Sequence, residues 1–208
     1  IGSLNTITVQ PDGSLAADNT DWVGIHELIV DGLAESRAPP PSQLTALVLG
    51  GGGTARAACY AMMRLGIGNL LICNRSADKA ETLATEFGGK VLGQLAEASE
   101  LDRLDVIISC VPGSAGLSLP VEALRRLHPL VLDAAYRPRE TPLLADARAA
   151  GCTAIEGIEM LFEQGCAQCL LWTHRPAPRR EIAISLAAFL AAKDFGELPK
   201  RLQIAMGS

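Results

Sequence analysis

Short apolar runs alternate along this chain with longer stretches in which apolar residues recur every three or four positions. The apolar runs predict strands at residues 5–10, 44–49 (LTALVL), 69–73 (NLLIC), 90–92, 105–111 (DVIISCV), 129–134 (PLVLDA) and 153–156. The helical spacing predicts helices at residues 22–33, 54–65, 77–87, 121–127, 142–150, 158–172 and 180–193. Between residues 44 and 172, predicted strands and helices therefore alternate.

Most of these predicted strands are apolar nearly throughout, instead of switching between apolar and polar residues. Such strands are typical of parallel sheets, because helices cover both faces of the sheet and bury every side chain. The predicted fold class is therefore α/β, with a doubly wound parallel sheet. Three prolines at residues 39–41 precede the first of the apolar strands and indicate a linker or a rigid entry into it.

Composition narrows the classes of function. Hydrophobic residues make up 49% of the 208 residues and charged residues 20%, so we expect a folded chain. The net charge of −5 and the lack of a Lys/Arg cluster argue against a nucleic-acid partner. The apolar run at residues 182–192 is shorter than the ~20 residues that cross a bilayer, so we expect no membrane contact.

The six cysteines lie mostly inside apolar segments, which fits a reducing, cytoplasmic setting. Cys166 and Cys169 form a CxxC pair, but no second pair and no neighbouring histidines complete a zinc site. We therefore predict no metal site and favour ordinary helix packing over redox chemistry for this pair.

Residues 50–55 (GGGGTA) directly follow a predicted strand and directly precede a predicted helix. They contain the pattern G-x-G-x-x-A, whose glycines let the backbone turn tightly and approach a pyrophosphate. The helix N-terminus behind them offers free N–H groups and a partial positive charge. We predict nucleotide binding here, with a purely structural turn as the alternative; the predicted contacts are Gly50, Gly51, Gly52, Gly53, Thr54 and Ala55.

The end of the second apolar strand distinguishes between the two nicotinamide cofactors. An acid there would bind the adenosine ribose of NAD, but this chain has Asn74, Arg75 and Ser76. A guanidinium can stack on adenine and pair with a 2′-phosphate, and the two neutral side chains can donate hydrogen bonds. The sequence therefore predicts NADP instead of NAD, with Arg75 as a solvated loop cation as the alternative.

Four further segments resemble segments of the shikimate dehydrogenase family, and they follow one another in the same order as in that family. Residues 1–6 (IGSLNT) are similar to its G-x-x-N-T segment, and residues 18–24 (DNTDWVG) are similar to its N-T-D-x-x-G segment. Residues 133–144 (DAAYRPRETPLL) resemble D-x-x-Y-x-P-x-x-T-P-L-L, and residues 157–164 (GIEMLFEQ) resemble G-x-x-M-L-x-x-Q. Within the family, residues 110–112 (CVP) and 164–168 (QGCAQ) look closest to the dehydrogenase module of the fungal pentafunctional shikimate-pathway (AROM) polypeptide.

The resemblance implies NADP-dependent reduction of 3-dehydroshikimate to shikimate, a small-molecule substrate. It implies that Asn5 and Asp21 bind substrate hydroxyls and that Asp21 is half of a catalytic Lys–Asp pair. It also implies that Gln164 binds a substrate hydroxyl and that Tyr136 lies near the substrate carboxylate and the nicotinamide. Gly157 and Met160 would lie at the nicotinamide.

Each of these residues also has a simpler interpretation. Asp21 suits the N-cap or first turn of the following helix. A tyrosine such as Tyr136 is often a packed aromatic with a satisfied hydroxyl. Met160 and Gln164, one turn apart, could be ordinary helix residues.

The family's catalytic lysine and its Ser-x-Ser segment lie upstream of the segment that residues 1–6 match. The lysines of this chain, Lys79, Lys90, Lys193 and Lys200, stand at no matching position. We therefore expect a fragment of a longer polypeptide, inactive by itself. We expect residues 1–20 to be a remnant of the substrate-binding domain, residues 21–158 to form a Rossmann-like NADP-binding domain, and residues 159–208 to form helices that pack back toward the substrate domain.

Two other functions stay open at the level of sequence. One is a non-catalytic shikimate- or quinate-sensing domain, because fungal repressors of quinate use carry a domain similar to this module. The other is a quinate dehydrogenase that prefers NAD, against which Arg75 argues.

Overall fold

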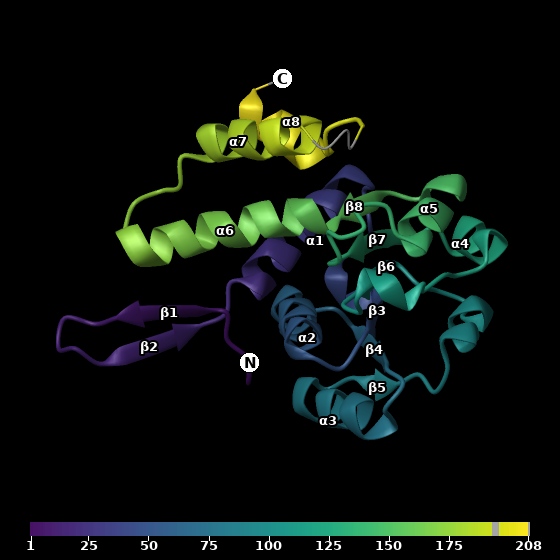
Figure 1. The fold of residues 1–208 in the computed structure, drawn as a ribbon. Helices are drawn as coiled ribbons and strands as arrows, with labels where there is room; N and C mark the ends of the chain where they lie inside the picture. The colour runs from purple at the N-terminus through teal and green to yellow at the C-terminus, as the bar shows by residue number, and fades with distance from the viewer. Residues whose placement is uncertain (193–195, 208) are drawn as a thin grey trace.

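The computed structural model describes residues 1–192 and 196–207. Its centre is a sheet of six parallel strands in the order β5-β4-β3-β6-β7-β8 (Figure 1). The strands are β3 (Thr45–Leu49), β4 (Asn69–Cys73), β5 (Lys90–Val91), β6 (Val106–Ser109), β7 (Leu130–Asp133) and β8 (Ala154–Glu156). The chain starts in the middle of the sheet, runs to one edge and returns to build the other half, which confirms the doubly wound α/β fold.

Alternate residues of each central strand enter two separate cores. In β3, Ala46 and Val48 belong to one core, and Leu47 and Leu49 belong to the other. Side chains of α1 (Asp21–Glu35), α2 (Gly53–Leu65), α3 (Ala77–Phe87) and α6 (Gly157–Thr173) fill the first core. Those of α4 (Val121–Leu127) and α5 (Pro142–Ala149) fill the second. The uninterrupted apolar strands are thus explained by burial on both faces.

Short 3₁₀ helices complete the connections around the sheet. They are η1 (Pro41–Gln43), η2 (Leu95–Glu100) and η3 (Gly113–Ala115). The three prolines therefore lead through one rigid turn directly into β3, in agreement with the interpretation of this segment as a rigid entry.

Two further helices, α7 (Arg179–Ala191) and α8 (Lys200–Met206), pack beyond α6 (Figure 1). They share a third core with α6, formed by Phe162, Ala183, Leu190 and Leu202 among others. The prediction of a helix at residues 180–193 is confirmed for the described residues, while Lys193 lies outside them. The sequence analysis did not predict α8, whose seven residues form fewer than two helical turns beyond their cap.

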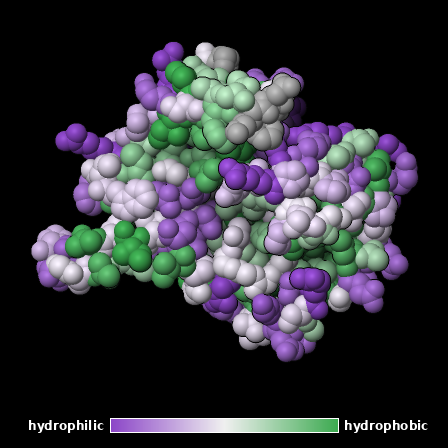
Figure 2. Space-filling model, viewed as in Figure 1, coloured by the Kyte–Doolittle hydropathy of each residue, from purple (hydrophilic) through white to green (hydrophobic). Residues whose placement is uncertain are grey.

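Strands β1 (Thr6–Val9) and β2 (Leu15–Asp18) form a separate antiparallel hairpin that projects from the body of the protein (Figure 1). Val9 lies opposite Leu15, and Ile7 lies opposite Ala17, so one face of the hairpin is apolar. Ile7, Val9 and Leu15 are 52%, 73% and 69% exposed. Figure 2 shows hydrophobic residues gathered along the projecting hairpin on the face in view.

The CxxC pair lies within α6. Cys166 is buried in the third core, and the Cys169 sulfur lies 3.9 Å from the Thr173 hydroxyl. Among the described residues, no cluster of His, Cys, Asp and Glu side chains could hold a metal ion. None of the described helices has the length and apolar character that a membrane span requires.

Helices α1 and α6 cross in close contact, and Gly24 makes this crossing possible. A Cβ at Gly24 would lie 3.0 Å from the Met160 carbonyl oxygen and 3.1 Å from the Gln164 nitrogen, both backbone atoms of α6. These atoms belong to a rigid helix and cannot move independently.

We therefore expect Gly24→Ala to lower the free energy of unfolding by about 1–3 kcal/mol, because it forces the two helices apart. Gly165→Ala is the matched control, since a Cβ at Gly165 of α6 would meet open space. Alanine there should stabilise the helix by about 0.5–1 kcal/mol. Urea denaturation of both variants measures the contrast; equal effects would show that the crossing does not depend on Gly24.

Candidate active site

The carboxyl ends of β3 and β6 open a crevice in the middle of the sheet. The two strands are neighbours, but α2, which follows β3, and α4, which follows β6, lie on opposite faces. At such a switch point the two connections diverge and leave space between them, which is where doubly wound proteins bind ligands. The loops that follow β3, β4, β6 and β7 all begin at the carboxyl ends of the strands, on this same side of the sheet.

The glycine loop occupies the β3 side of this crevice. Gly50 has a φ of +129°, and a Cβ there would lie 3.2 Å from the Cys110 carbonyl oxygen. Gly52 is the N-cap of α2, with no side-chain capping bond, and a Cβ there would meet nothing within 4 Å. Ala55, the last residue of the motif, is fully buried against the sheet. The N–H groups of the first turn of α2 have no partner within the helix, and the space at Gly52 in front of them is open, as an anion site requires.

The loop after β4 lies directly beside the glycine loop. A Cβ at Gly51 would lie 2.9 Å from the Asn74 amide nitrogen and 2.9 Å from the Lys79 Cβ. The Asn74 amide donates a hydrogen bond of 3.1 Å to the Ser76 carbonyl oxygen. Arg75 and Lys79 are exposed, and in the described part of the chain neither forms an ion pair. Lys79 was missed in the sequence analysis, although its place in the first turn of α3 brings it next to Ser76.

A polar cluster joins three of the predicted substrate residues. The Asn5 amide donates hydrogen bonds of 2.8 Å to the Asp21 carboxylate and 3.1 Å to the Thr20 hydroxyl. The Thr20 hydroxyl in turn donates to the Gln164 side-chain oxygen at 3.0 Å. The structure thus brings Asn5, Asp21 and Gln164 together across more than 140 positions of sequence. Thr20, which the sequence analysis did not single out, is the buried link between them.

A chain of hydrogen bonds connects this polar cluster to the glycine loop. The Asn19 side chain donates at 2.9 Å to the Ser3 hydroxyl and accepts at 3.0 Å from the Asp21 backbone N–H. The Ser3 hydroxyl donates at 3.1 Å to the Gly53 carbonyl oxygen. The predicted substrate and cofactor residues therefore border the same crevice.

Asp21 occupies the first position of α1, after the N-cap Thr20. Its first-turn placement agrees with the simpler interpretation, but its surroundings go beyond it. Burial raises the pKa of Asp21 above its usual value, and the hydrogen bond from Asn5 only partly opposes this. No Arg or Lys of the described residues forms an ion pair with Asp21. A half-buried carboxylate without a cation favours a ligand that brings hydrogen-bond donors or a positive charge.

The loop that carries Tyr136 is held at both ends. Asp133 accepts hydrogen bonds from the Ala135 backbone N–H at 3.1 Å and from the Thr141 hydroxyl at 2.7 Å. Burial raises the pKa of Asp133. Tyr136 itself is 48% exposed, and no hydrogen bond among the described residues ties it to the polar cluster.

The other two predicted nicotinamide residues lie at the start of α6. Gly157 begins this helix directly against the Tyr136 loop, because a Cβ there would lie 2.5 Å from the Ala135 carbonyl oxygen. Met160 is buried in the main core, where its backbone also meets Gly24 of α1. The structure therefore places Gly157 against the loop that carries Tyr136, with Met160 in the first turn of the same helix.

Comparison with known proteins identifies the family of this chain. A model of "Shikimate / quinate 5-dehydrogenase" matches residues 32–132, and a model of "Shikimate 5'-dehydrogenase C-terminal domain" matches residues 157–183. The crystal structure of shikimate dehydrogenase from Mycobacterium tuberculosis is 34% identical with a TM-score of 0.72, covering 90% of this chain and 68% of that one. This chain belongs to the shikimate dehydrogenase family.

Two further relatives are a fungal multifunctional protein and a bacterial quinate dehydrogenase. The pentafunctional AROM polypeptide of Komagataella phaffii is 36% identical over 184 residues, which is 83% of this chain and 12% of that protein. A quinate dehydrogenase from Corynebacterium glutamicum, solved in complex with NAD, is 25% identical with a TM-score of 0.74, covering 88% of this chain and 68% of that one. The family consists of oxidoreductases that use a nicotinamide cofactor. This chain spans about an eighth of the length of the AROM relative.

The geometry of the glycine loop predicts a small effect on folding for one substitution and a large loss for another. Gly52→Val should lower the free energy of unfolding by no more than about 1 kcal/mol, because the new side chain enters open space and only its poorer N-capping counts against it. Gly50→Val should lower it by about 2 kcal/mol or more, because a β-branched residue is strained at a φ of +129° and meets the Cys110 backbone. Urea denaturation compares them; a large loss for Gly52→Val would contradict the open loop.

Proposed function

We propose that this chain is the nucleotide-binding part of an NADP-dependent shikimate dehydrogenase, which reduces 3-dehydroshikimate to shikimate as part of a longer polypeptide. The observation that carries the proposal is the polar cluster of Asn5, Asp21 and Gln164, linked by hydrogen bonds to the glycine loop. Its oxygens and amide groups suit a substrate with several hydroxyls. Its place in the crevice puts such a substrate beside the nucleotide.

The proposed cofactor is NADP, with its pyrophosphate on the N-terminus of α2. Arg75 and Lys79 support this choice, since both are exposed cations beside the glycine loop and no acid stands at the end of β4. Asn74 and Ser76 lie next to them, where they can bind the ribose. The C. glutamicum relative solved with NAD shows that the fold also accommodates the cofactor without the 2′-phosphate. The charges at this loop are therefore the basis for selectivity.

The bound nicotinamide supplies or accepts the hydride, and the residues of this chain bind and orient the substrate. In the proposal, Asn5 and Gln164 hold hydroxyls, and Asp21 accepts a hydroxyl hydrogen and holds an ammonium in its charged, proton-donating state. Tyr136 would lie near the substrate carboxylate and the nicotinamide, and Gly157 and Met160 would pack against the nicotinamide. A cation beside Asp21 would lower the pKa that burial raises.

The cation is proposed to come from residues outside this chain. Of the described lysines, Lys79 lies on α3, Lys90 on β5 and Lys200 on α8, and none of them belongs to the polar cluster. The exposed apolar face of the β1–β2 hairpin supports a missing neighbour, because apolar surface of this kind is normally covered. We propose residues 1–20 as a remnant of the substrate-binding domain, 21–158 as the NADP-binding domain and 159–208 as helices packing toward the former.

The setting proposed is the cytoplasm. All six cysteines are free, and Cys59, Cys152 and Cys166 are buried, as in proteins of reducing compartments.

NADP should bind this chain more tightly than NAD, because Arg75 can pair with the 2′-phosphate. Arg75→Ala should weaken NADP binding by about 1.5–3 kcal/mol and leave NAD binding nearly unchanged. Gly52→Val, whose side chain would fill the space for the pyrophosphate, should weaken both nucleotides. Calorimetric titration with NADP and with NAD measures the affinities of the unmodified chain and of the two variants. Equal affinity of the unmodified chain for NADP and NAD would contradict the proposed cofactor.

Activity should require the longer polypeptide. The 208 residues alone should show no NADP-linked oxidation of shikimate, because general acid catalysis contributes roughly 10²- to 10⁴-fold and the proposed lysine is absent. In a parent protein that includes the preceding domain, Asp21→Asn should lower kcat by about 10²-fold or more while NADP affinity stays constant.

Asp12→Asn is the matched control for this loss of kcat. Asp12 lies in the turn of the β1–β2 hairpin, where its carboxylate accepts hydrogen bonds from the Ser14 backbone N–H and hydroxyl. Activity of the short chain, or an active parent that tolerates Asp21→Asn, would refute the assignment. An inactive parent that binds shikimate or quinate would favour a sensor, and faster NAD-linked oxidation of quinate would favour a quinate dehydrogenase.

A further inference from the structure

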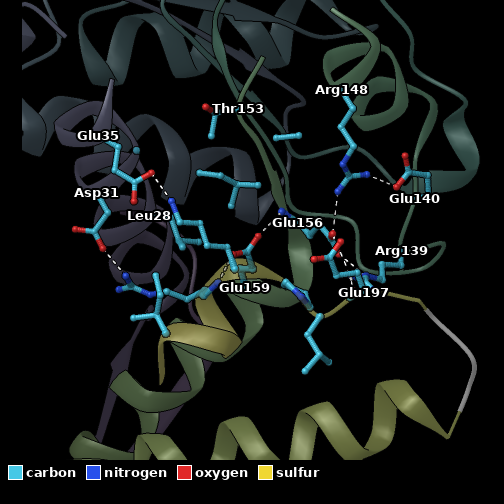
Figure 3. Close-up of a pocket in the computed structure, with 18 of the residues that line it drawn as sticks. Leu28, Asp31, Glu35, Arg139, Glu140, Arg148, Thr153, Glu156, Glu159 and Glu197 are labelled. Carbon is cyan, nitrogen blue, oxygen red and sulfur yellow. Dashed lines mark hydrogen bonds and ion pairs between the residues drawn. The ribbon is translucent and has the colours of Figure 1, made fainter. Parts of the chain in front are cut away.

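Glu156 lies at the end of β8, in the wall of an open pocket of about 950 Å³ that α1, β8, α8 and the loop before α5 line (Figure 3). It is only 6% exposed, although it is an acid. A carboxylate so deeply buried needs several hydrogen bonds to offset the loss of water. Its partners therefore show which parts of the structure depend on it.

The partners of Glu156 come from the Tyr136 loop and from α5. Arg139, three residues after Tyr136, donates to both carboxylate oxygens of Glu156, with its Nη2 at 3.2 Å from Oε1. Arg148 of α5 donates to Oε1 at 2.8 Å. Figure 3 shows both guanidinium groups converging on this one carboxylate.

Glu156 is also the N-cap of α6. Its side chain accepts from the backbone N–H of Glu159, and the Glu159 carboxylate accepts in return from the Glu156 N–H at 3.0 Å. This reciprocal capping box fixes the first turn of α6, and the negative charge suits the positive end of the helix. One carboxylate thus joins the Tyr136 loop to the helix that carries Met160 and Gln164.

Next to this carboxylate, the backbone of α6 packs so closely against the Tyr136 loop that no side chain would fit between them. The first residue of α6, Gly157, touches the carbonyl oxygens of Ala134 and Ala135 so closely that a Cβ would lie 2.6 and 2.5 Å from them. A small shift of the loop or of the helix would therefore change the crevice surface that Tyr136 and Gly157 form. The glycine permits the contact, while the charged hydrogen bonds of Glu156 hold it in place.

We propose that Glu156 is a positioning residue for the nicotinamide half of the cofactor. It acts through Arg139 on the Tyr136 loop and through the capping box on α6, and it does not touch the cofactor itself. This inference rests on the proposed function, because it assumes that a nicotinamide nucleotide binds between that loop and α6. The adenosine half, held at the glycine loop and at residues 74–79, should be independent of Glu156.

The test compares two ligands on the full 208-residue chain. NADPH contains the nicotinamide half, whereas adenosine 2′,5′-bisphosphate contains only the adenosine end. Glu156→Gln keeps the shape of the side chain but removes its charge. It should weaken NADPH binding by about tenfold, the loss expected for charge-assisted hydrogen bonds, and leave bisphosphate affinity within about twofold. The fluorescence of bound NADPH should change in parallel, since it reports the surroundings of the nicotinamide.

Glu140→Gln is the matched control. Glu140 pairs with the same Arg148, but it is exposed and does not cap α6. It should leave the affinity for both ligands unchanged. If Glu156→Gln does not fold, Arg139→Gln replaces it in the same comparison of the two ligands, because it removes the partner of Glu156 on the Tyr136 loop.

Equal losses for the two ligands would show that Glu156 only stabilises the fold, and no loss for either would show that it positions nothing. Both results would overturn the inference and leave the proposed function intact. If the unmodified chain binds the bisphosphate as tightly as NADPH, the nicotinamide is not held here and the inference also falls. If the unmodified chain binds neither ligand, the proposed function itself fails and takes the inference with it.

Discussion

Burial of the β3–β6 pair on both faces is the constraint from which the rest of this structure follows. Because the two strands are buried along their whole length and all their side chains except Thr45 and Ser109 are apolar, helices must cover both faces, and the connections from β3 and β6 leave the sheet in opposite directions. The crevice between them is a geometric consequence of that divergence. The glycine loop fits there because Gly50 turns the chain against Cys110 in a conformation that other residues rarely adopt.

Close backbone contacts at glycines then bring distant segments to the crevice. Gly24 lets α1 cross α6, so that Thr20 reaches Gln164, and Gly157 lets α6 begin against the Tyr136 loop. At both contacts a glycine removes the steric obstacle, and hydrogen bonds of neighbouring side chains fix the position. The polar cluster and the glycine loop therefore depend on packing between helices as much as on their own residues.

Much of this arrangement could be predicted from the sequence, and the exceptions have physical reasons. Strands such as β4 and helices such as α3 have the predicted bounds, because buried apolar runs and helical periodicity are local signals. The β2 strand was missed because LAAD carries no strong strand preference, and its partner β1 determines it. The partnership of Thr20 with Gln164 spans 144 positions, and only the crossing of α1 and α6 creates it. The network of Glu156 likewise depends on tertiary contacts that no local pattern shows.

Glu163 and Asp21 differ in how the scaffold compensates their charge. Burial raises the pKa of Glu163, but hydrogen bonds from Arg179 and Arg201 outweigh it, so that its pKa is lowered. Its pairing therefore contributes stability at neutral pH, which is lost as the pH falls through its folded pKa. Asp21 and Asp133 have raised pKa values, so their charges cost stability at neutral pH, and this cost disappears as the pH falls through theirs. The scaffold thus compensates Glu163 with arginines, whereas Asp21 forms no ion pair with any Arg or Lys of the described residues.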